Sequence, residues 1–233
     1  MKLFIQQGIR WPLGHLIFFI LIASQVFISC KNQDRLNPLI LTKQDSIDQQ
    51  KFITRAFKSI AEIKHIIHSG DFVTRTGNDF TSQSLRTLNR RNETYSHCGI
   101  ASIENDSLFI YHAMGGEWNP DEKLRRDPFE SFAEPYSNKG IGIFNFLVTD
   151  SLKNNLLNVT RQFYQDGLMF DMDFDLQTDD RMYCAEFIYK TFLKASNNQL
   201  AFNKSRIGDF VFIGVDDIFL HPLCRTRIEI VYK

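Results

Sequence analysis

Hydrophobic and polar positions alternate along residues 95–114 in a way that is typical of two paired strands. The stretches YSHCGIASI and SLFIYHAM are separated only by END, a polar turn signal. We therefore expect a β-hairpin in which Ile103 lies opposite Leu108. Because successive side chains point to opposite faces of a strand, this register places His97 and His112 on one face as diagonal neighbours.

Apolar residues recur every three to four positions in three other segments, which predicts helices there. The helices are expected at residues 44–69, at 150–167, and in the stretch DDRMYCAEFIYKTF at 179–192. Strands are expected at 70–75, 141–148, 207–217 and 227–233. The long charged segment 115–140 is expected to be a loop that borders a cleft. This order of elements predicts one α+β domain with a mainly antiparallel sheet or small barrel.

The first thirty residues differ from the rest. Lys2 and Arg10 precede an apolar run at 16–28, which is short for a bilayer span and suits the core of a signal peptide. The run ends at Ser29 and Cys30, an arrangement that resembles a bacterial lipoprotein signal. We expect residues 1–30 to be a signal ending at a lipidated Cys30, 31–43 a tether, and 44–233 the folded domain. A signal anchor, or a plain signal cut nearby, is the alternative.

Charge and cysteine content narrow the classes of function. Lys and Arg total 27 and so do Asp and Glu, so no basic surface for nucleic acid is expected. Beyond Cys30 the chain has Cys98, Cys184 and Cys224, and a disulfide between Cys98 and Cys224 is compatible with the sequence. No CxxC pair occurs and the histidines lack metal-ligand spacing, so neither a metal site nor a cofactor is expected.

Cys184 falls near the start of a predicted helix, where Asp179 or Asp180 is expected to be the N-cap. The positive end of the helix dipole lowers the pKa of a thiol and favours the reactive thiolate. A neighbouring imidazole would lower it further by forming an ion pair. The alternative is a cysteine that only fills the core, since cysteine is among the most buried residue types.

Four short motifs, taken in order, resemble a known family. GDFVTR, SHCGI, FDMDF and YCAEFIY, between residues 70 and 189, are similar to motifs of the permuted papain-like amidases of the NlpC/P60 superfamily, the YiiX/YaeF-like group. The resemblance implies a papain-like fold with Cys184 as nucleophile, His97 as general base and His112 as the residue that orients His97. Relatives often carry a glutamate where His112 stands. Tyr183 and Asp171 are candidates for the oxyanion or substrate site.

Together these features predict an exported, membrane-tethered cysteine hydrolase of the cell envelope, a bacterial lipoprotein facing the periplasm. It would cleave an amide, such as that of a peptidoglycan stem peptide, or an acyl ester, through a Cys-His-His site and an acyl-enzyme. The expected partner is a small peptide or lipid-type substrate, without nucleic acid. The alternative is a catalytically inactive papain-like lipoprotein that serves as a binding module. The sequence leaves the substrate, the membrane and the oligomeric state open.

Overall fold

The computed structural model describes residues 42–116 and 119–233. The chain divides into two compact units, Met1–Ile47 and Asp48–Lys233, and the second unit holds the sheet described below. The predicted signal with Cys30, and the predicted tether up to residue 41, lie outside the described residues. Within the described ranges, no helix combines the length and the apolar character needed to cross a bilayer.

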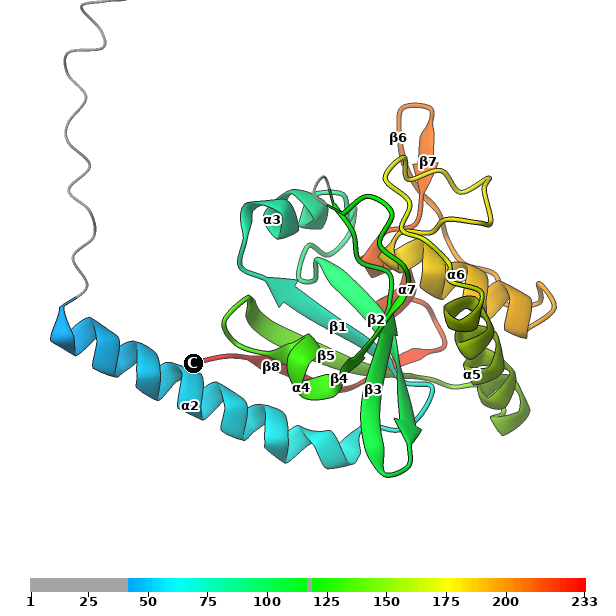
Figure 1. The fold of residues 1–233 in the computed structure, drawn as a ribbon. Helices are drawn as coiled ribbons and strands as arrows, with labels where there is room; N and C mark the ends of the chain where they lie inside the picture. Colours follow the sequence, from blue (N-terminus) through cyan, green and yellow to red (C-terminus); the bar gives the residue numbers. More distant parts are fainter. Residues whose placement is uncertain (1–41, 117–118) are drawn as a thin grey trace, which may run out of the picture. The chain divides into compact units, whose positions relative to one another are not determined.

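Six antiparallel strands form the main sheet, in the order β4-β3-β2-β1-β5-β8 (Figure 1). Their bounds are β1 Phe72–Gly77, β2 His97–Glu104, β3 Ser107–His112, β4 Arg125–Pro128, β5 Asn138–Phe146 and β8 Cys224–Val231. A separate hairpin consists of β6 Ser205–Ile207 and β7 Phe210–Phe212. The predicted α+β class is confirmed. The sheet is open, because β4 and β8 each have a single neighbouring strand.

The central hairpin has the predicted register. Ile103 pairs with Leu108, and the turn residues Asn105 and Asp106 have φ angles of 47° and 62°. Two consecutive residues with positive φ suit a tight hairpin turn, whose twist matches that of the flanking strands. The same register carried along the strands puts His97 and His112 on one face of the sheet.

Helices cover both faces of the sheet (Figure 1). Their bounds are α2 Lys43–Ile63, α3 Phe80–Arg86, α4 Phe129–Ala133, α5 Asp150–Gln165, α6 Cys184–Ala195 and α7 Val215–Phe219, with a 3-10 turn η2 at Lys64–Ile66. Apolar side chains of α5 and α6 share one buried cluster with Phe72 and Ile100. Those of α4 and the second half of α2 share another with Val73 and Ile110. The sheet is therefore sandwiched between two helical layers.

The helix expected at 44–69 ends earlier, because α2 stops at Ile63 and the 3-10 turn at Ile66. Two further segments differ in the kind of element that they contain. Segment 115–140 is not only a loop, because it contains β4 and α4. Segment 207–217 is not one strand: Gly208, with φ of +58°, turns the chain between β6 and β7, and α7 follows. Both errors concern elements of five residues or fewer, which are too short to show a clear period of apolar positions.

Candidate active site

Cys184 is the first residue of α6. The helix begins one residue after the extended Tyr183, so the predicted N-caps Asp179 and Asp180 were wrong. The Glu186 carboxylate accepts a hydrogen bond from the Tyr183 N–H at 3.3 Å, which holds the chain at the helix entry. The apolar side chains of the next two turns pack α6 onto the sheet. The sequence thus fixes the thiol at the N-terminal end of a buried helix.

Three side chains on three adjacent strands form a hydrogen-bonded line, which we call the relay. His97 Nε2 lies 2.8 Å from His112 Nδ1, and His112 Nε2 lies 3.1 Å from an Asp127 carboxylate oxygen. Both imidazole rings pack against the Phe132 ring, with centroids 5.8 Å and 5.1 Å away. Arg125 pairs with the same Asp127 oxygen at 2.7 Å. The relay therefore runs across β2, β3 and β4 with its rings held by packing.

The relay assigns a tautomer to each histidine. A carboxylate only accepts, so His112 Nε2 carries the proton that it donates to Asp127. When His112 is neutral, its Nδ1 is then the acceptor, and His97 Nε2–H donates to it. His97 Nδ1 is left as an unprotonated nitrogen with a free lone pair. This is the protonation state that a general base needs.

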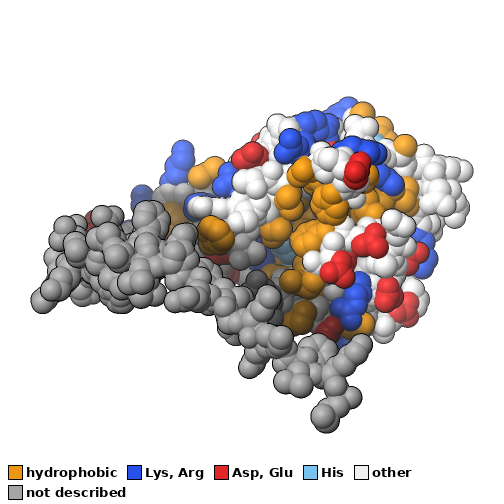
Figure 2. Space-filling view, turned by 90° about the horizontal axis from the view of Figure 1, so that it is seen from above, with side chains coloured by type: hydrophobic (Ala, Val, Ile, Leu, Met, Phe, Trp, Pro, Cys, Tyr) orange, Lys and Arg blue, Asp and Glu red, His pale blue; other side chains and the backbone are white. Residues whose placement is uncertain are grey.

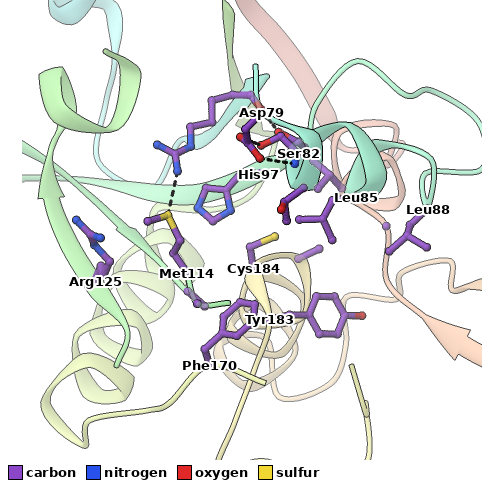
Figure 3. Close-up of a pocket in the computed structure, with 18 of the residues that line it drawn as sticks. Asp79, Ser82, Leu85, Leu88, His97, Met114, Arg125, Phe170, Tyr183 and Cys184 are labelled. Carbon is purple, nitrogen blue, oxygen red and sulfur yellow. Dashed lines mark hydrogen bonds between the residues drawn. The ribbon is translucent and has the colours of Figure 1, made fainter. Parts of the chain in front are cut away.

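Cys184 and His97 line the same pocket, whose volume is about 440 Å³. The helix α6 lies on one face of the sheet and the His97 side chain on the other, and both residues border the pocket near the start of β2. Figure 3 shows the thiol and the imidazole facing a common space. Among the described residues no hydrogen bond joins them. The pocket thus brings the two predicted residues together and leaves room between them and its walls.

The surroundings of the pocket lower the pKa of Cys184 and keep both imidazoles neutral. A hydrogen bond from the Cys98 thiol is the main cause that lowers the pKa of Cys184, and the Arg75 charge acts in the same direction. Burial, with the charge of Arg75 next in importance, lowers the pKa of His97 well below its ordinary value. Burial also lowers the pKa of His112 to about 4. The cation beside the thiol is therefore Arg75 rather than the expected imidazolium.

The two candidates for the oxyanion or substrate site have other contacts. The Tyr183 hydroxyl accepts a hydrogen bond from the Ile213 N–H at 2.8 Å, while its ring lines the pocket. The Asp171 carboxylate accepts from the N–H groups of Asp173 and Asp175, and does not line the pocket. Asp171 thus holds the acidic loop, and Tyr183 contributes an apolar surface to the pocket.

The remaining cysteines of the described residues form no disulfide with each other, and the donor groups near the pocket can be compared with those that a metal ion needs. Cys98 and Cys224 are both free and buried. Among the described residues, no group of three or more His, Cys, Asp or Glu side chains is arranged to hold a metal ion. Both ring nitrogens of His112 are already taken by the relay. The donor set of the pocket therefore does not fit a metal centre.

Sequence reasoning missed Asp127 and Arg75. Asp127 lies on β4, inside the segment expected to be a loop. Arg75 lies on β1 directly opposite His97. Arg75 could have been found from the sequence, because GDFVTR and SHCGI were both expected to be strands. Pairing these two strands would have placed Arg75 opposite His97.

Comparison with known proteins bears on the fold. No protein-family model matches the sequence, and neither does any curated protein. The crystal structure of metalloprotein yiiX from Escherichia coli O157:H7 is similar, with a TM-score of 0.57 and 15% sequence identity. The match covers 70% of this chain and 98% of that one. The chain shares its fold with yiiX.

Proposed function

We propose that the protein is a cysteine hydrolase that cleaves an amide or acyl ester bond through an acyl-enzyme. The observation that carries this proposal is the relay, which leaves His97 Nδ1 unprotonated in the pocket that Cys184 also lines. His97 takes the thiol proton, and the sulfur attacks the carbonyl carbon. The backbone N–H of Cys184 is the candidate donor to the oxyanion.

The leaving group then takes the proton from His97 Nδ1, and a water molecule, activated by the same nitrogen, hydrolyses the thioester. Throughout, His97 Nε2–H donates to His112, and the Asp127 carboxylate stabilises the positive charge that His97 acquires. Asp127 thereby supplies the carboxylate that relatives often carry as a glutamate. The apolar walls of the pocket accept an acyl chain or the side chains of a small peptide.

Turnover of two simple substrates tests the chemistry. Purified protein is incubated with p-nitrophenyl octanoate and with a stem-peptide amide, and quenched samples are searched for an acyl group on Cys184. Cys184→Ser should lower turnover by about a thousandfold or more, whereas the matched Cys224→Ser should retain it. Equal turnover by the wild type and Cys184→Ser would overturn the proposal.

The second candidate function is a binding module without catalysis. It is favoured by the lack of a hydrogen bond between Cys184 and His97 among the described residues. A binding module would retain the ligand without an acyl-enzyme, and Cys184→Ser would bind it as well as the wild type does. Recovery of each test substrate after incubation with the wild type separates the two functions, because a binding module returns it intact and a hydrolase does not.

We also propose that Cys30 carries lipid and tethers the protein to the bacterial cell envelope, facing the periplasm. The support is the apolar run at 16–28, the small Ser29 before Cys30, and the polar residues that follow. Mass spectrometry of the N-terminal peptide, with detergent partitioning of the cellular protein, tests it. An intact N-terminus at Met1, or a soluble form cut elsewhere, would contradict it.

A further inference from the structure

Arg75 is a cationic residue in the wall of the pocket, close to Cys184, and it forms no ion pair with a carboxylate of the described residues. Its guanidinium donates to the Phe132 carbonyl at 3.0 Å and to the Met114 sulfur at 3.1 Å. It also lies over the Phe132 ring, 4.8 Å from the centroid. Among the described residues, no carboxylate lies within ion-pair distance of it. A thioether is a weak acceptor, so this cation keeps donor capacity that the protein does not use.

The acidic side chains of the pocket all have other partners. Asp79 accepts from the N–H and hydroxyl of Ser82. Asp127 is bound by His112 and Arg125, and Glu134 accepts from the backbone N–H groups of residues 136 and 137. The pocket therefore holds three satisfied carboxylates and two guanidinium groups. Arg125 is paired with Asp127, whereas Arg75 forms no ion pair with a carboxylate of the described residues.

The remaining walls are mostly apolar. They include Leu85, Leu88, Phe170, Phe174 and Phe212. Figure 3 shows Leu85 and Leu88 on one side of Cys184, with Met114 and Arg125 on the other. On the face drawn in Figure 2, hydrophobic side chains gather in the middle with charged side chains around them. A ligand that fits has one apolar end, and an anionic group toward the arginines.

We propose that Arg75, supported by Arg125, is an anion-binding subsite and that the substrate carries a carboxylate or a phosphate close to the bond that is cleaved. That the bound anion belongs to a substrate rests on the proposed function, whereas the anion-binding subsite does not. A planar guanidinium binds both anions through two parallel hydrogen bonds, which gives orientation as well as affinity. The carbonyl would then be held at Cys184 from one side by charge and from the other by apolar contact.

A matched pair of thiol reagents tests the subsite without any substrate. Iodoacetate carries a carboxylate next to its reactive carbon, and iodoacetamide is its neutral counterpart. The rate ratio of the two at Cys184 is measured by peptide mass spectrometry in the native protein and in urea. The native ratio should favour iodoacetate by about tenfold or more over the unfolded ratio, as expected for charge-assisted hydrogen bonds. Equal ratios in the native and unfolded protein would overturn the proposal.

Variants show which residue is responsible. Arg75→Gln should bring the native ratio down to the unfolded one, and Arg75→Lys should keep most of the preference. Arg55→Gln removes the same charge from the exposed surface of α2 and should change nothing. Any effect of Arg75 on the pKa of Cys184 alters both reagents equally, so it cancels in the ratio. An unchanged ratio in a folded Arg75→Gln, checked by circular dichroism, would reject the assignment to Arg75.

Protection of Cys184 identifies the anion. Hexanoate, hexyl phosphate and neutral hexanamide are compared as protectants against iodoacetamide. Protection by either anion, at concentrations where hexanamide has no effect, supports the subsite. The anion that protects at the lower concentration shows whether the subsite prefers a carboxylate or a phosphate. Equal protection by all three would show a purely apolar pocket and overturn it. Alkylation needs no turnover, so a protein that keeps the preference yet hydrolyses nothing refutes the hydrolase alone.

Discussion

Replacing Glu186 by Gln should remove a pH-dependent loss of stability in the first turn of α6. The Glu186 side chain is completely buried, and burial raises its pKa from an ordinary value of 4.5 to about 7. Lys190 Nζ lies 3.0 Å from Oε1 without hydrogen-bond geometry, and the Tyr183 N–H reaches Oε2. These two contacts oppose the shift but do not cancel it.

The sign and size of the effect follow from this shift. An acid whose folded pKa is raised binds its proton more tightly in the folded state, so it stabilises the fold below pH 4.5. That contribution is lost as the pH rises from 4.5 through 7. Each unit of pKa is worth about 1.36 kcal/mol, which gives about 3.4 kcal/mol as an upper bound. Relaxation of the folded protein around the charged carboxylate reduces the expected loss to about 2 kcal/mol.

Urea unfolding of the wild type and Glu186→Gln at pH 4.5, 6, 7 and 8 measures this difference. The variant keeps the shape of the side chain, and its amide oxygen still accepts from the Tyr183 N–H. The wild type should lose about 2 kcal/mol relative to the variant between pH 4.5 and 8. Parallel profiles, within about 0.5 kcal/mol across this range, would refute the reasoning, because they would mean that Glu186 ionises in the folded protein as it does in water.

Three further predictions concern the site. Iodoacetamide should modify Cys184 at least about tenfold faster than Cys98 or Cys224, because burial raises the pKa of those two thiols. Equal rates, measured by peptide mass spectrometry, would contradict the assignment of Cys184 as the nucleophile. Cys98→Ala should raise the pKa of Cys184 more than His97→Ala does, because the hydrogen bond from Cys98 is the main cause that lowers it; the pH dependence of alkylation reports the order. Asp127→Asn should lower kcat/KM by about a hundredfold, because Asp127 acts on His97 only through the His112 ring. Full activity of this variant would disprove the role of the relay.

The central part of the site was accessible from sequence because local rules determine it. The alternation on both sides of the END turn set the register, and the register placed His97 and His112 together. The apolar period predicted the helix that carries Cys184, although the expected N-caps, Asp179 and Asp180, placed its start too early. In both cases the pattern extends over eight or more residues, long enough for the period to be read.

The positions of Asp127, and of Arg75 beside the thiol, could not be predicted from such a pattern. The strand that carries Asp127 has the sequence RRDP, which contains no apolar residue and ends in proline. It forms a strand only because β3 offers it hydrogen-bonding partners, and that is a tertiary effect. The charge beside Cys184 was assigned to a histidine because the burial that keeps both imidazoles neutral is not visible in a sequence.

The position of β4 at the edge of the sheet has a consequence for heat tolerance. Its four residues are bonded to β3 alone, whereas β1 and β2 are bonded on both sides. Short edge strands open locally at a lower free energy than the centre of a sheet, so amide exchange should be fastest there among the strands of the site. Each opening takes Asp127 away from His112 and frees that ring to change tautomer. The proposed hydrolysis should therefore fail on warming before the fold does, with Cys184 still in place.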